Sequence, residues 1–190
     1  MQMYVCGDKD GDFDNLVIMH EYTHGISNRL TGGPGASGCL SNTEQMGEGW
    51  SDFYGVILTM EPGDLGTDPR GVGTYLFGQG AGGPGIRPFP YSTDLGVNPQ
   101  TYDDIKTAAV PHGVGSVWAT MLWEMTWGLI DEHGWDPNVS NFTGDPNVDA
   151  GNVMALALVT EGMKLQPCGP GFVDGRDAIL AADLAIYGGV

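Results

Sequence analysis

The amino-acid sequence predicts a mainly α-helical fold, with about five helices joined by long glycine-rich loops. Apolar residues recur at helical spacing in five separate segments. Most of the 32 glycines and 12 prolines fall between those segments, where they favour turns and loops. A chain of 190 residues with 41% hydrophobic content can bury one substantial core, so we expect residues 1–190 to form one unit.

The first expected helix covers residues 13–30. Asp10 or Asp12 stands near its N-cap, because a short acidic side chain can accept hydrogen bonds from the free amides of a helix start. The pair Gly32 and Gly33 ends this helix. An apolar stripe that we expect to face the interior is formed by Phe13, Leu16 and Val17.

The other helices are expected over residues 42–60, 111–132, 149–166 and 174–187, with Asp174 as the cap of the last one. The segment 111–132 is apolar on several faces, which predicts a central and buried helix. Residues 63–110 hold many glycines and prolines and predict a long irregular segment with one short hairpin. Loops of this length are more often functional than idle.

Charge and composition exclude several classes of function. The formal net charge is −17 with only seven Lys and Arg, whereas nucleic-acid binding needs clustered basic residues. No stretch of 18 apolar residues exists, so we expect no membrane partner. Of the three cysteines, Cys39 and Cys168 lie in Gly/Pro-rich loops and are the expected disulfide pair, which leaves Cys6 over.

The segment His20-Glu21-Tyr22-Thr23-His24 has the pattern H-E-x-x-H. Residues four apart in a helix lie on one face, so both imidazoles can point at one metal ion. The alternative, two core histidines and a surface glutamate, is disfavoured because the chain has only four histidines. We therefore predict a zinc site with His20 and His24 as ligands. Glu21 is then the general base that takes the proton of the attacking water.

Two acidic residues in the second expected helix complete the predicted site. Glu48 and Asp52 are like charges four residues apart, which disfavours a helix unless cations lie beside them. A ligating histidine normally donates its other N–H to a carboxylate. We therefore predict Glu48 as the third zinc ligand and Asp52 as the carboxylate that holds a zinc-bound histidine. The alternative is that both are solvated acids on a helix surface.

Five stretches of this sequence carry a family resemblance: HEYTHGISNRLTGGP, GEGWSD, GIRPFPYSTD, PHGVGSVWATMLWEM and FVDGRDAILAAD. They resemble the catalytic half of the fungalysin family of secreted metalloendopeptidases, which are relatives of thermolysin. The likeness covers residues 8–189, nearly the whole chain. It implies the helical C-terminal lobe of a thermolysin-like peptidase, with zinc held by two histidines and a distal glutamate.

Two further residues take their expected roles from this resemblance. His112 looks like the family's transition-state histidine, in a segment similar to the G-V-H-x-x-S-G stretch of thermolysin. A donor at that place stabilises the oxyanion of the tetrahedral intermediate. Arg87 resembles the thermolysin-type arginine that binds a substrate carbonyl on the leaving-group side of the scissile bond. We therefore predict His112 as catalytic and Arg87 as substrate-binding.

Two parts of the thermolysin pattern have no clear match. The acid that orients the transition-state histidine lies five residues before it, where this chain has Thr107. Asp103 and Asp104 are the candidates to replace it. The second oxyanion donor of thermolysin is a tyrosine, for which Tyr91 and Tyr102 are the candidates.

The resemblance also implies the surroundings of this lobe. In the family a signal, an inhibitory propeptide and an N-terminal β-rich lobe precede the segment seen here. The start MQMYVCGDKDGD lacks the basic and apolar regions of a signal peptide, so we expect Met1 to be an internal or artificial start. The expected protein is secreted and extracellular, its substrates are proteins or peptides, and its partners are the upstream lobe and the propeptide.

Three alternatives remain open at this point. A zinc aminopeptidase shares H-E-x-x-H, but it needs an anchor of the G-x-M-x-N type, which this chain lacks. A non-catalytic, zinc-stabilised remnant has no use for Glu21. Calcium is a weak second expectation for DKDGDFD, because the glycine stands fourth and Met19 twelfth in an EF-hand register. N-terminal charge on the first helix explains much of this acidic run.

Overall fold

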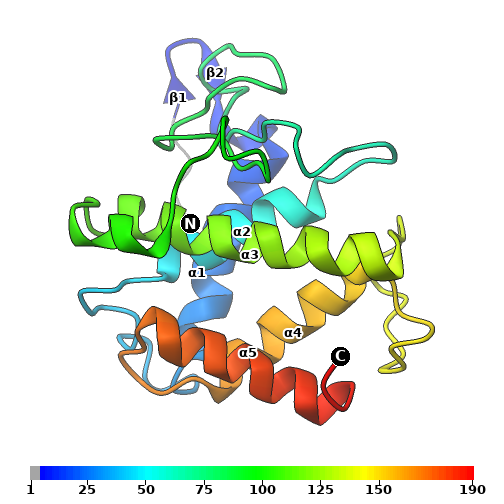
Figure 1. The fold of residues 1–190 in the computed structure, drawn as a ribbon. Helices are drawn as coiled ribbons and strands as arrows, with labels where there is room; N and C mark the ends of the chain where they lie inside the picture. The colour runs from blue at the N-terminus through cyan, green and yellow to red at the C-terminus, as the bar shows by residue number, and fades with distance from the viewer. Residues whose placement is uncertain (1–4) are drawn as a thin grey trace.

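Five α-helices dominate the computed structural model, which describes residues 5–190 (Figure 1). They are α1 (Asn15–Leu30), α2 (Gly47–Leu58), α3 (His112–His133), α4 (Gly151–Leu165) and α5 (Phe172–Ile186). Two short strands, β1 (Val5–Cys6) and β2 (Lys9–Asp10), pair antiparallel, and two 3-10 turns, η1 (Gly11–Phe13) and η2 (Tyr102–Lys106), complete the elements. The predicted mainly α-helical class is confirmed.

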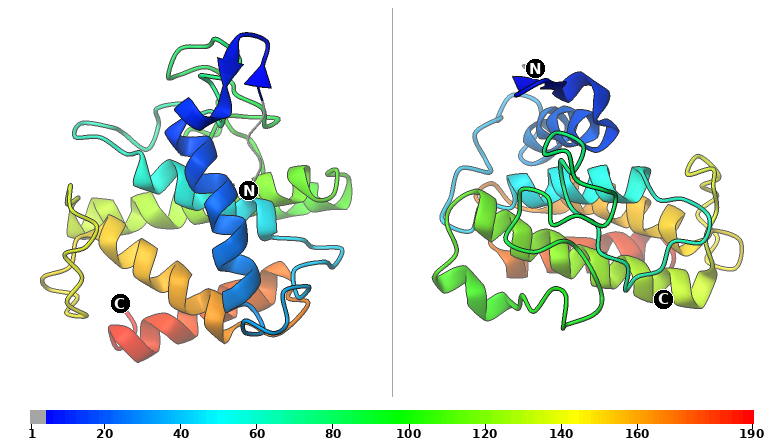
Figure 2. Two further views of the ribbon diagram at one scale, coloured as in Figure 1. Left: turned by 180° about the vertical axis from the view of Figure 1, so that it is seen from behind. Right: turned by 90° about the horizontal axis from the view of Figure 1, so that it is seen from above.

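The helices pack in chain order around α3, which crosses the middle of the molecule in Figure 1. Helix α1 packs on α2, α2 on α3, α3 on α4, and α4 on α5. Seen from behind, α1 runs across the outside of this stack (Figure 2). One face of α1 therefore meets α2, and its opposite face is left on the surface.

Large aromatic side chains join the helices in the core. The rings of Trp50 in α2 and Trp118 in α3 meet edge to face with centroids 4.9 Å apart. Trp118 meets Phe172 of α5 at the same centroid distance. Each of these pairs adds about 0.5–1.5 kcal/mol beyond the burial of its area. Helix α3 is buried along most of its length, as its apolar faces predicted.

Helix α1 begins at Asn15, two residues later than predicted. Its N-cap is Asp14, whose carboxylate accepts hydrogen bonds from the amides of Leu16 and Val17. Asp10 caps η1 instead, through the amide of Asp12. Phe13 lies in η1 and is 74% exposed, so its assignment to the buried stripe was wrong. The reason is that the chain turns at Asp14, where extended backbone separates η1 from α1.

Other helix ends also differ from the predictions. Helix α2 starts at Gly47, not at residue 42, because residues 31–46 form successive turns. The N-cap of α5 is Gly171, and Asp174 lies within the first turn, where it accepts a hydrogen bond from the Gly171 amide. Capping by an acid three residues inside a helix gives the same sequence signal as an N-cap acid.

The long segment between α2 and α3 is irregular, as predicted. Its expected hairpin is reduced to one antiparallel bridge between Arg70 and Tyr91, whose amides and carbonyls exchange two hydrogen bonds of 2.9 Å. The β1–β2 hairpin lies beside this segment at the top of Figure 1, where the Lys9 ammonium lies 4.5 Å from the centre of the Tyr75 ring. These contacts join parts of the segment to each other and to the β1–β2 hairpin without regular structure.

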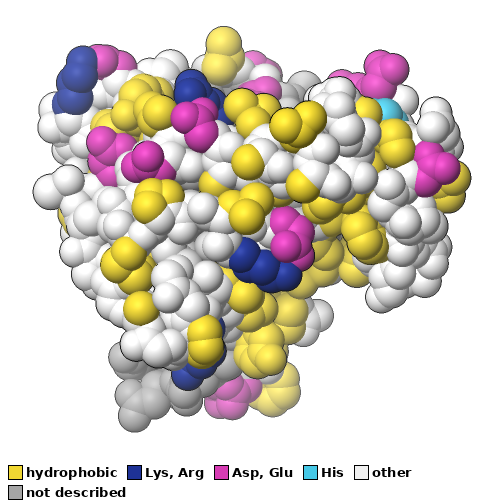
Figure 3. Space-filling model, turned by 90° about the horizontal axis from the view of Figure 1, so that it is seen from below, with side chains coloured by type: hydrophobic (Ala, Val, Ile, Leu, Met, Phe, Trp, Pro, Cys, Tyr) yellow, Lys and Arg dark blue, Asp and Glu magenta, His cyan; other side chains and the backbone are white. Residues whose placement is uncertain are grey.

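The predicted disulfide between Cys39 and Cys168 is present, and it joins the loop after α1 to the loop before α5. On the face seen from below, acidic side chains lie scattered among hydrophobic and uncharged ones (Figure 3). Over the part of the chain that the structure describes, we found no helix with the length and apolar character needed to cross a membrane.

Candidate metal centre

Three predicted ligands converge where α1 packs on α2. The Nε2 atoms of His20 and His24, one turn apart on α1, are 3.1 Å from each other. The Glu48 carboxylate of α2 reaches both, with Oε2 3.4 Å from Nε2 of His20 and Oε1 3.6 Å from Nε2 of His24. Among residues 5–190, these three side chains form a group that could hold a metal ion. Each offers one ligand atom, and the three ligand atoms lie within 4.8 Å of one another.

These separations fit a zinc ion. Ligand atoms about 2.0–2.1 Å from a tetrahedral zinc lie about 3.3–3.4 Å from each other. The two imidazole nitrogens are 3.1 Å apart, and the two oxygens of Glu48 each approach one of them, at 3.4 and 3.6 Å; with one atom taken from each side chain, all three lie within 4.8 Å of one another. Two imidazoles and one carboxylate are also the donor set of catalytic zinc sites, which leave one position open. The donor set and its geometry therefore fit a metal ion such as zinc, held by three side chains.

Glycines let the helices approach closely enough to bring these ligands together. A Cβ on Gly49 would lie 2.4 Å from the carbonyl oxygen of Gly115, and a Cβ on Gly115 would lie 2.4 Å from the Cβ of Glu48. On the other side of α2, a Cβ on Gly55 would lie 3.0 Å from Leu16 of α1. Helix α2 is therefore in close contact with both neighbours, and Glu48 is positioned by backbone packing.

Asp52 orients the first ligand. Its Oδ1 lies 2.6 Å from Nδ1 of His20, and its side chain is completely buried. An ionised carboxylate can only accept, so Nδ1 carries the proton and donates. The lone pair of Nε2 in His20 is then free to point at the metal.

Arg87 comes from the long segment between α2 and α3 and binds both acids of α2. Its Nε and Nη2 donate to Oδ2 and Oδ1 of Asp52 at 2.6 and 3.0 Å, and Nη2 donates to Glu48 at 2.8 Å. The residue is only 8% exposed. This fork of donors offsets the cost of burying two carboxylates four residues apart.

Mutual attraction in this cluster shifts several pKa values. Burial alone would lower the pKa of His20, but the hydrogen bonds to Asp52 and Glu48 outweigh it and raise that pKa to about 9. Burial alone would raise the pKa of Glu48, yet the hydrogen bond to His20 and the charge of Arg87 lower it to about 2. Burial, followed by the charge of His20, lowers the pKa of His24. The Glu48 carboxylate is thus ionised at neutral pH, as metal binding requires, whereas a metal that binds Nε2 of His20 has to displace a proton from it.

Comparison with known proteins identifies the family. The chain matches the family model described as Fungalysin metallopeptidase (M36) over residues 1–190. The chain belongs to the fungalysin family. This confirms the resemblance that the five sequence stretches indicated.

Fungal proteins are among the relatives of this fungalysin. The "Extracellular metalloproteinase mep" of Aspergillus fumigatus is 45% identical over 195 residues, which include 100% of this chain and 30% of the relative. The "Extracellular metalloproteinase MEP" of Fusarium vanettenii is 46% identical over 189 residues, with 98% of this chain and 29% of the relative covered. "Extracellular metalloproteinase 2" of Arthroderma otae is 44% identical over 183 residues, with 95% and 28% covered. The chain spans about 30% of the length of such relatives.

The two predicted catalytic side chains of this fungalysin lie at the rim of the ligand group. Glu21 follows His20 on α1, is partly exposed, and lines a surface pocket with His24. His112 begins α3, with its side chain 66% exposed and its Nε2 3.5 Å from Oε1 of Glu48. Both side chains are therefore accessible from solvent beside the ligands.

The candidates for orienting His112 are engaged elsewhere. Asp103 pairs with Lys106, and Asp104 accepts hydrogen bonds from the amide and hydroxyl of Thr101. Asp104 and His112 line the same pocket, but in the described residues the nearest carboxylate paired with His112 is that of Glu48. The expectation of an orienting aspartate is not met, because η2 uses these acids for its own capping and surface pairing.

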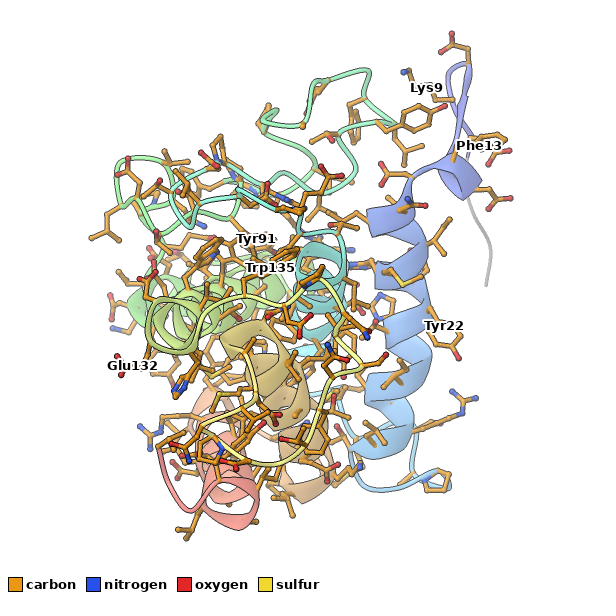
Figure 4. All side chains as sticks on the ribbon, turned by 90° about the vertical axis from the view of Figure 1, so that its right-hand side faces the viewer. Lys9, Phe13, Tyr22, Tyr91, Glu132 and Trp135 are labelled. Carbon is orange, nitrogen blue, oxygen red and sulfur yellow. A yellow bond between two sulfur atoms is a disulfide. The ribbon has the colours of Figure 1, made fainter. Side chains whose placement is uncertain are left out.

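The tyrosine candidates are likewise engaged. Tyr91 is completely buried, and its hydroxyl donates to Oδ2 of Asp52, so it is not placed to reach a substrate oxyanion. Figure 4 shows Tyr91 among the packed side chains, whereas Tyr22 of α1 points outward. Tyr102 stacks on Phe172 with ring centroids 5.4 Å apart. No hydrophobic periodicity in the sequence indicates that Tyr91 is buried or that it binds Asp52. The one sequence feature that connects Tyr91 with the site is its position four residues after Arg87.

Proposed function

We propose that this chain is the catalytic lobe of an extracellular zinc endopeptidase that hydrolyses internal peptide bonds of proteins. The observation that carries this proposal is the convergence of the His20 and His24 nitrogens with the Glu48 carboxylate, one ligand atom from each lying within 4.8 Å of the others, beside Glu21. Membership of a metallopeptidase family supports it. The names of the relatives, which are extracellular metalloproteinases, support the location.

Zinc, when bound, supplies Lewis-acid chemistry that activates a water molecule near neutral pH and polarises a carbonyl group. Glu21 is not part of the ligand group, so its carboxylate remains available as a general base. It takes a proton from the attacking water and delivers it to the leaving amine. Neither transfer needs a covalent bond between enzyme and substrate.

His112 and Arg87 bind the reacting peptide in this proposal. The exposed imidazole of His112 donates a hydrogen bond to the oxyanion that forms at the scissile carbonyl. Arg87 lines the same surface pocket as His112. Its Nε and Nη2 are used by Asp52 and Glu48, which leaves Nη1 as the donor for a substrate carbonyl. Arginine can serve both purposes because its donors point in fixed, separate directions.

The whole active protein in this proposal is larger than residues 1–190. The chain spans about 30% of the length of its relatives, which supports an additional upstream lobe and an inhibitory propeptide as partners. The outer face of α1 next to the ligands carries an apolar pocket lined by Tyr22, Gly25 and Ile26. That face is a suitable contact for the upstream lobe. One zinc per chain is the cofactor, and nothing in the DKDGDFD segment requires calcium, since Asp10 and Asp14 serve as caps.

The test uses substitutions that separate metal binding from catalysis. Glu48→Ala should remove most of the bound zinc and all activity, because it deletes one of three ligands. Glu21→Gln should keep one zinc per chain and lose casein hydrolysis by several orders of magnitude, since an amide cannot accept the proton. Glu132→Gln, on the exposed surface of α3, is the matched control and should change neither. Full activity of the Glu21→Gln protein, or full zinc occupancy in Glu48→Ala, would overturn these assignments.

A further inference from the structure

Tyr91 is fixed at both its backbone and its side chain. Its amide and carbonyl form the two 2.9 Å hydrogen bonds of the bridge to Arg70. Its ring is completely buried, and its hydroxyl donates to Oδ2 of Asp52. A buried phenol normally has a hydrogen-bond partner, but a neutral acceptor would satisfy it equally well. Here the acceptor is the carboxylate that holds His20.

The Asp52 carboxylate receives a full set of donors. Oδ1 accepts from Nδ1 of His20 at 2.6 Å and from Nη2 of Arg87 at 3.0 Å. Oδ2 accepts from Nε of Arg87 at 2.6 Å and from the Tyr91 hydroxyl. A carboxylate has about four acceptor positions, so all of them are used. Any rotation of the carboxylate would break bonds on both oxygens, and the plane of the group is therefore fixed.

The donors of Asp52 differ in what else they bind. Arg87 also binds Glu48, so removing it disturbs two acids of the site at once. His20 is itself a ligand in the metal group. The Tyr91 hydroxyl reaches the ligand group through Asp52, so its loss removes a donor to Asp52 and leaves every ligand in place. Removing this hydroxyl therefore changes the hydrogen bonding of the carboxylate that holds His20 and leaves the three ligands unchanged.

We propose that Tyr91 is a positioning residue that sets the zinc affinity of the site through Asp52 and His20. The proposal rests on the zinc site of the proposed function. The hydroxyl of Tyr91 holds Oδ2 in place, which keeps Oδ1 in line with Nδ1 of His20 and keeps Nε2 of that ring directed at the metal. Groups that orient metal ligands in this way commonly contribute a factor of 10–100 in metal affinity.

The test compares two tyrosine-to-phenylalanine variants of the chain. Tyr91→Phe removes the hydroxyl on Asp52. Tyr187→Phe removes a matched hydroxyl that donates to buried Asp149 at 2.9 Å, away from the ligands. Zinc dissociation constants are measured by chelator competition, together with the visible spectrum of the Co²⁺-substituted proteins. We expect Tyr91→Phe to bind zinc about tenfold more weakly and to shift the cobalt spectrum, and Tyr187→Phe to do neither.

A double-mutant cycle shows whether the effect passes through Asp52. In an Asp52→Asn background, Tyr91→Phe should change the zinc affinity much less than in the wild-type protein, because the supported carboxylate is gone. Equal effects in both backgrounds would overturn the proposal. Wild-type zinc affinity and an unchanged cobalt spectrum in Tyr91→Phe would also overturn it, and would leave the proposed function intact. Absence of zinc binding by the wild-type chain would instead refute the proposed function.

A measurement on the unmutated protein covers the case in which Tyr91→Phe fails to fold. In a proton NMR spectrum, the buried hydroxyl proton of Tyr91 should give a resonance that is protected from exchange and that shifts when zinc is added. The reason is that hydrogen bonds connect Tyr91 through Asp52 to His20, and zinc bound to His20 polarises them. The hydroxyl proton of Tyr187 should not move. A Tyr91 resonance that stays in place on zinc addition would contradict the proposal.

Discussion

Gly49 of α2 and Gly115 of α3 lie in direct backbone contact at the point where the two helices cross. A Cβ on Gly49 would lie 2.4 Å from the Gly115 carbonyl oxygen, and a Cβ on Gly115 would lie 2.4 Å from the Cβ of Glu48 and 2.8 Å from the Gly49 amide. Neither helix can therefore carry a larger residue here without moving. Since Glu48 precedes Gly49, this crossing also determines where the third metal ligand lies.

Gly115→Ala is expected to weaken both stability and zinc binding. The added methyl group has to push α2 away from α3, and such overpacking costs about 1–3 kcal/mol of unfolding free energy. The shift also displaces Glu48 from the two histidines. Chemical denaturation and zinc titration measure the two effects. Gly128→Ala, also on α3 but with no atom near the added Cβ, is the control and should be neutral or slightly stabilising. Similar behaviour of the two variants would disprove this account of the crossing.

His112→Ala is expected to lower kcat about 10²–10³-fold with zinc content unchanged, the size expected for one lost oxyanion donor. The imidazole of His112 also lies 3.5 Å from Oε1 of Glu48, so it could either donate to the substrate or hold Glu48 in place. The two roles differ in whether the substitution changes the zinc content. Steady-state kinetics and metal analysis of the same preparation measure the two properties. His133→Ala, at the other end of α3, should retain full activity. A loss of zinc in His112→Ala would point to a ligand-supporting role instead.

We expect Asp149 to make the free energy of unfolding depend on pH in the acidic range. Burial would raise its pKa, but hydrogen bonds from Thr143, Gly144 and Tyr187 outweigh burial and lower the pKa below the ordinary value of 3.8. A depressed carboxyl pKa stabilises the folded state above the unfolded value, and this contribution is lost as pH falls through the folded value. Asp149→Asn should therefore unfold in less urea than wild type near pH 6, and the difference should narrow near pH 3. An equal difference at both pH values would contradict the prediction.

Residues 1–190 on their own are expected to bind zinc but to cleave proteins poorly. Under the proposed function an upstream lobe supplies part of the substrate-binding surface, and binding energy remote from the scissile bond supports the chemical step. Adding that lobe should therefore raise kcat and lower KM, with kcat/KM rising about tenfold or more. The comparison is made with equal zinc content in both proteins. Equal kcat/KM values would show that the chain is self-sufficient.

Much of the site is readable from local sequence. His20 and His24 share a helix face by spacing alone, and the i, i+4 pair Glu48 and Asp52 needs a nearby cation to be stable in a helix. These four residues meet in the structure as the spacing indicated. The five helices were also predictable, because each has an apolar face that must be buried.

Local sequence was less informative about helix starts. The acidic residues around residues 8–14 all favour a helix N-terminus, and only the three-dimensional path shows that Asp14 caps α1 while Asp10 caps η1. Asp174 gave the signal of a cap although it lies inside α5. Several acids near a helix start stabilise it in similar ways, so sequence alone does not select the one that forms the first hydrogen bond.

The sequence by itself determined the chemistry of the site, because a two-histidine motif and its carboxylates are recognisable from spacing within two helices. Tertiary structure decided how that chemistry is supported. Arg87 and Tyr91 stand 35 and 39 residues after Asp52, in a segment without periodicity, and Gly115 meets Glu48 only because α3 crosses α2 at that point. Such contacts depend on the path of the chain between elements, and that path is set by packing of the whole core.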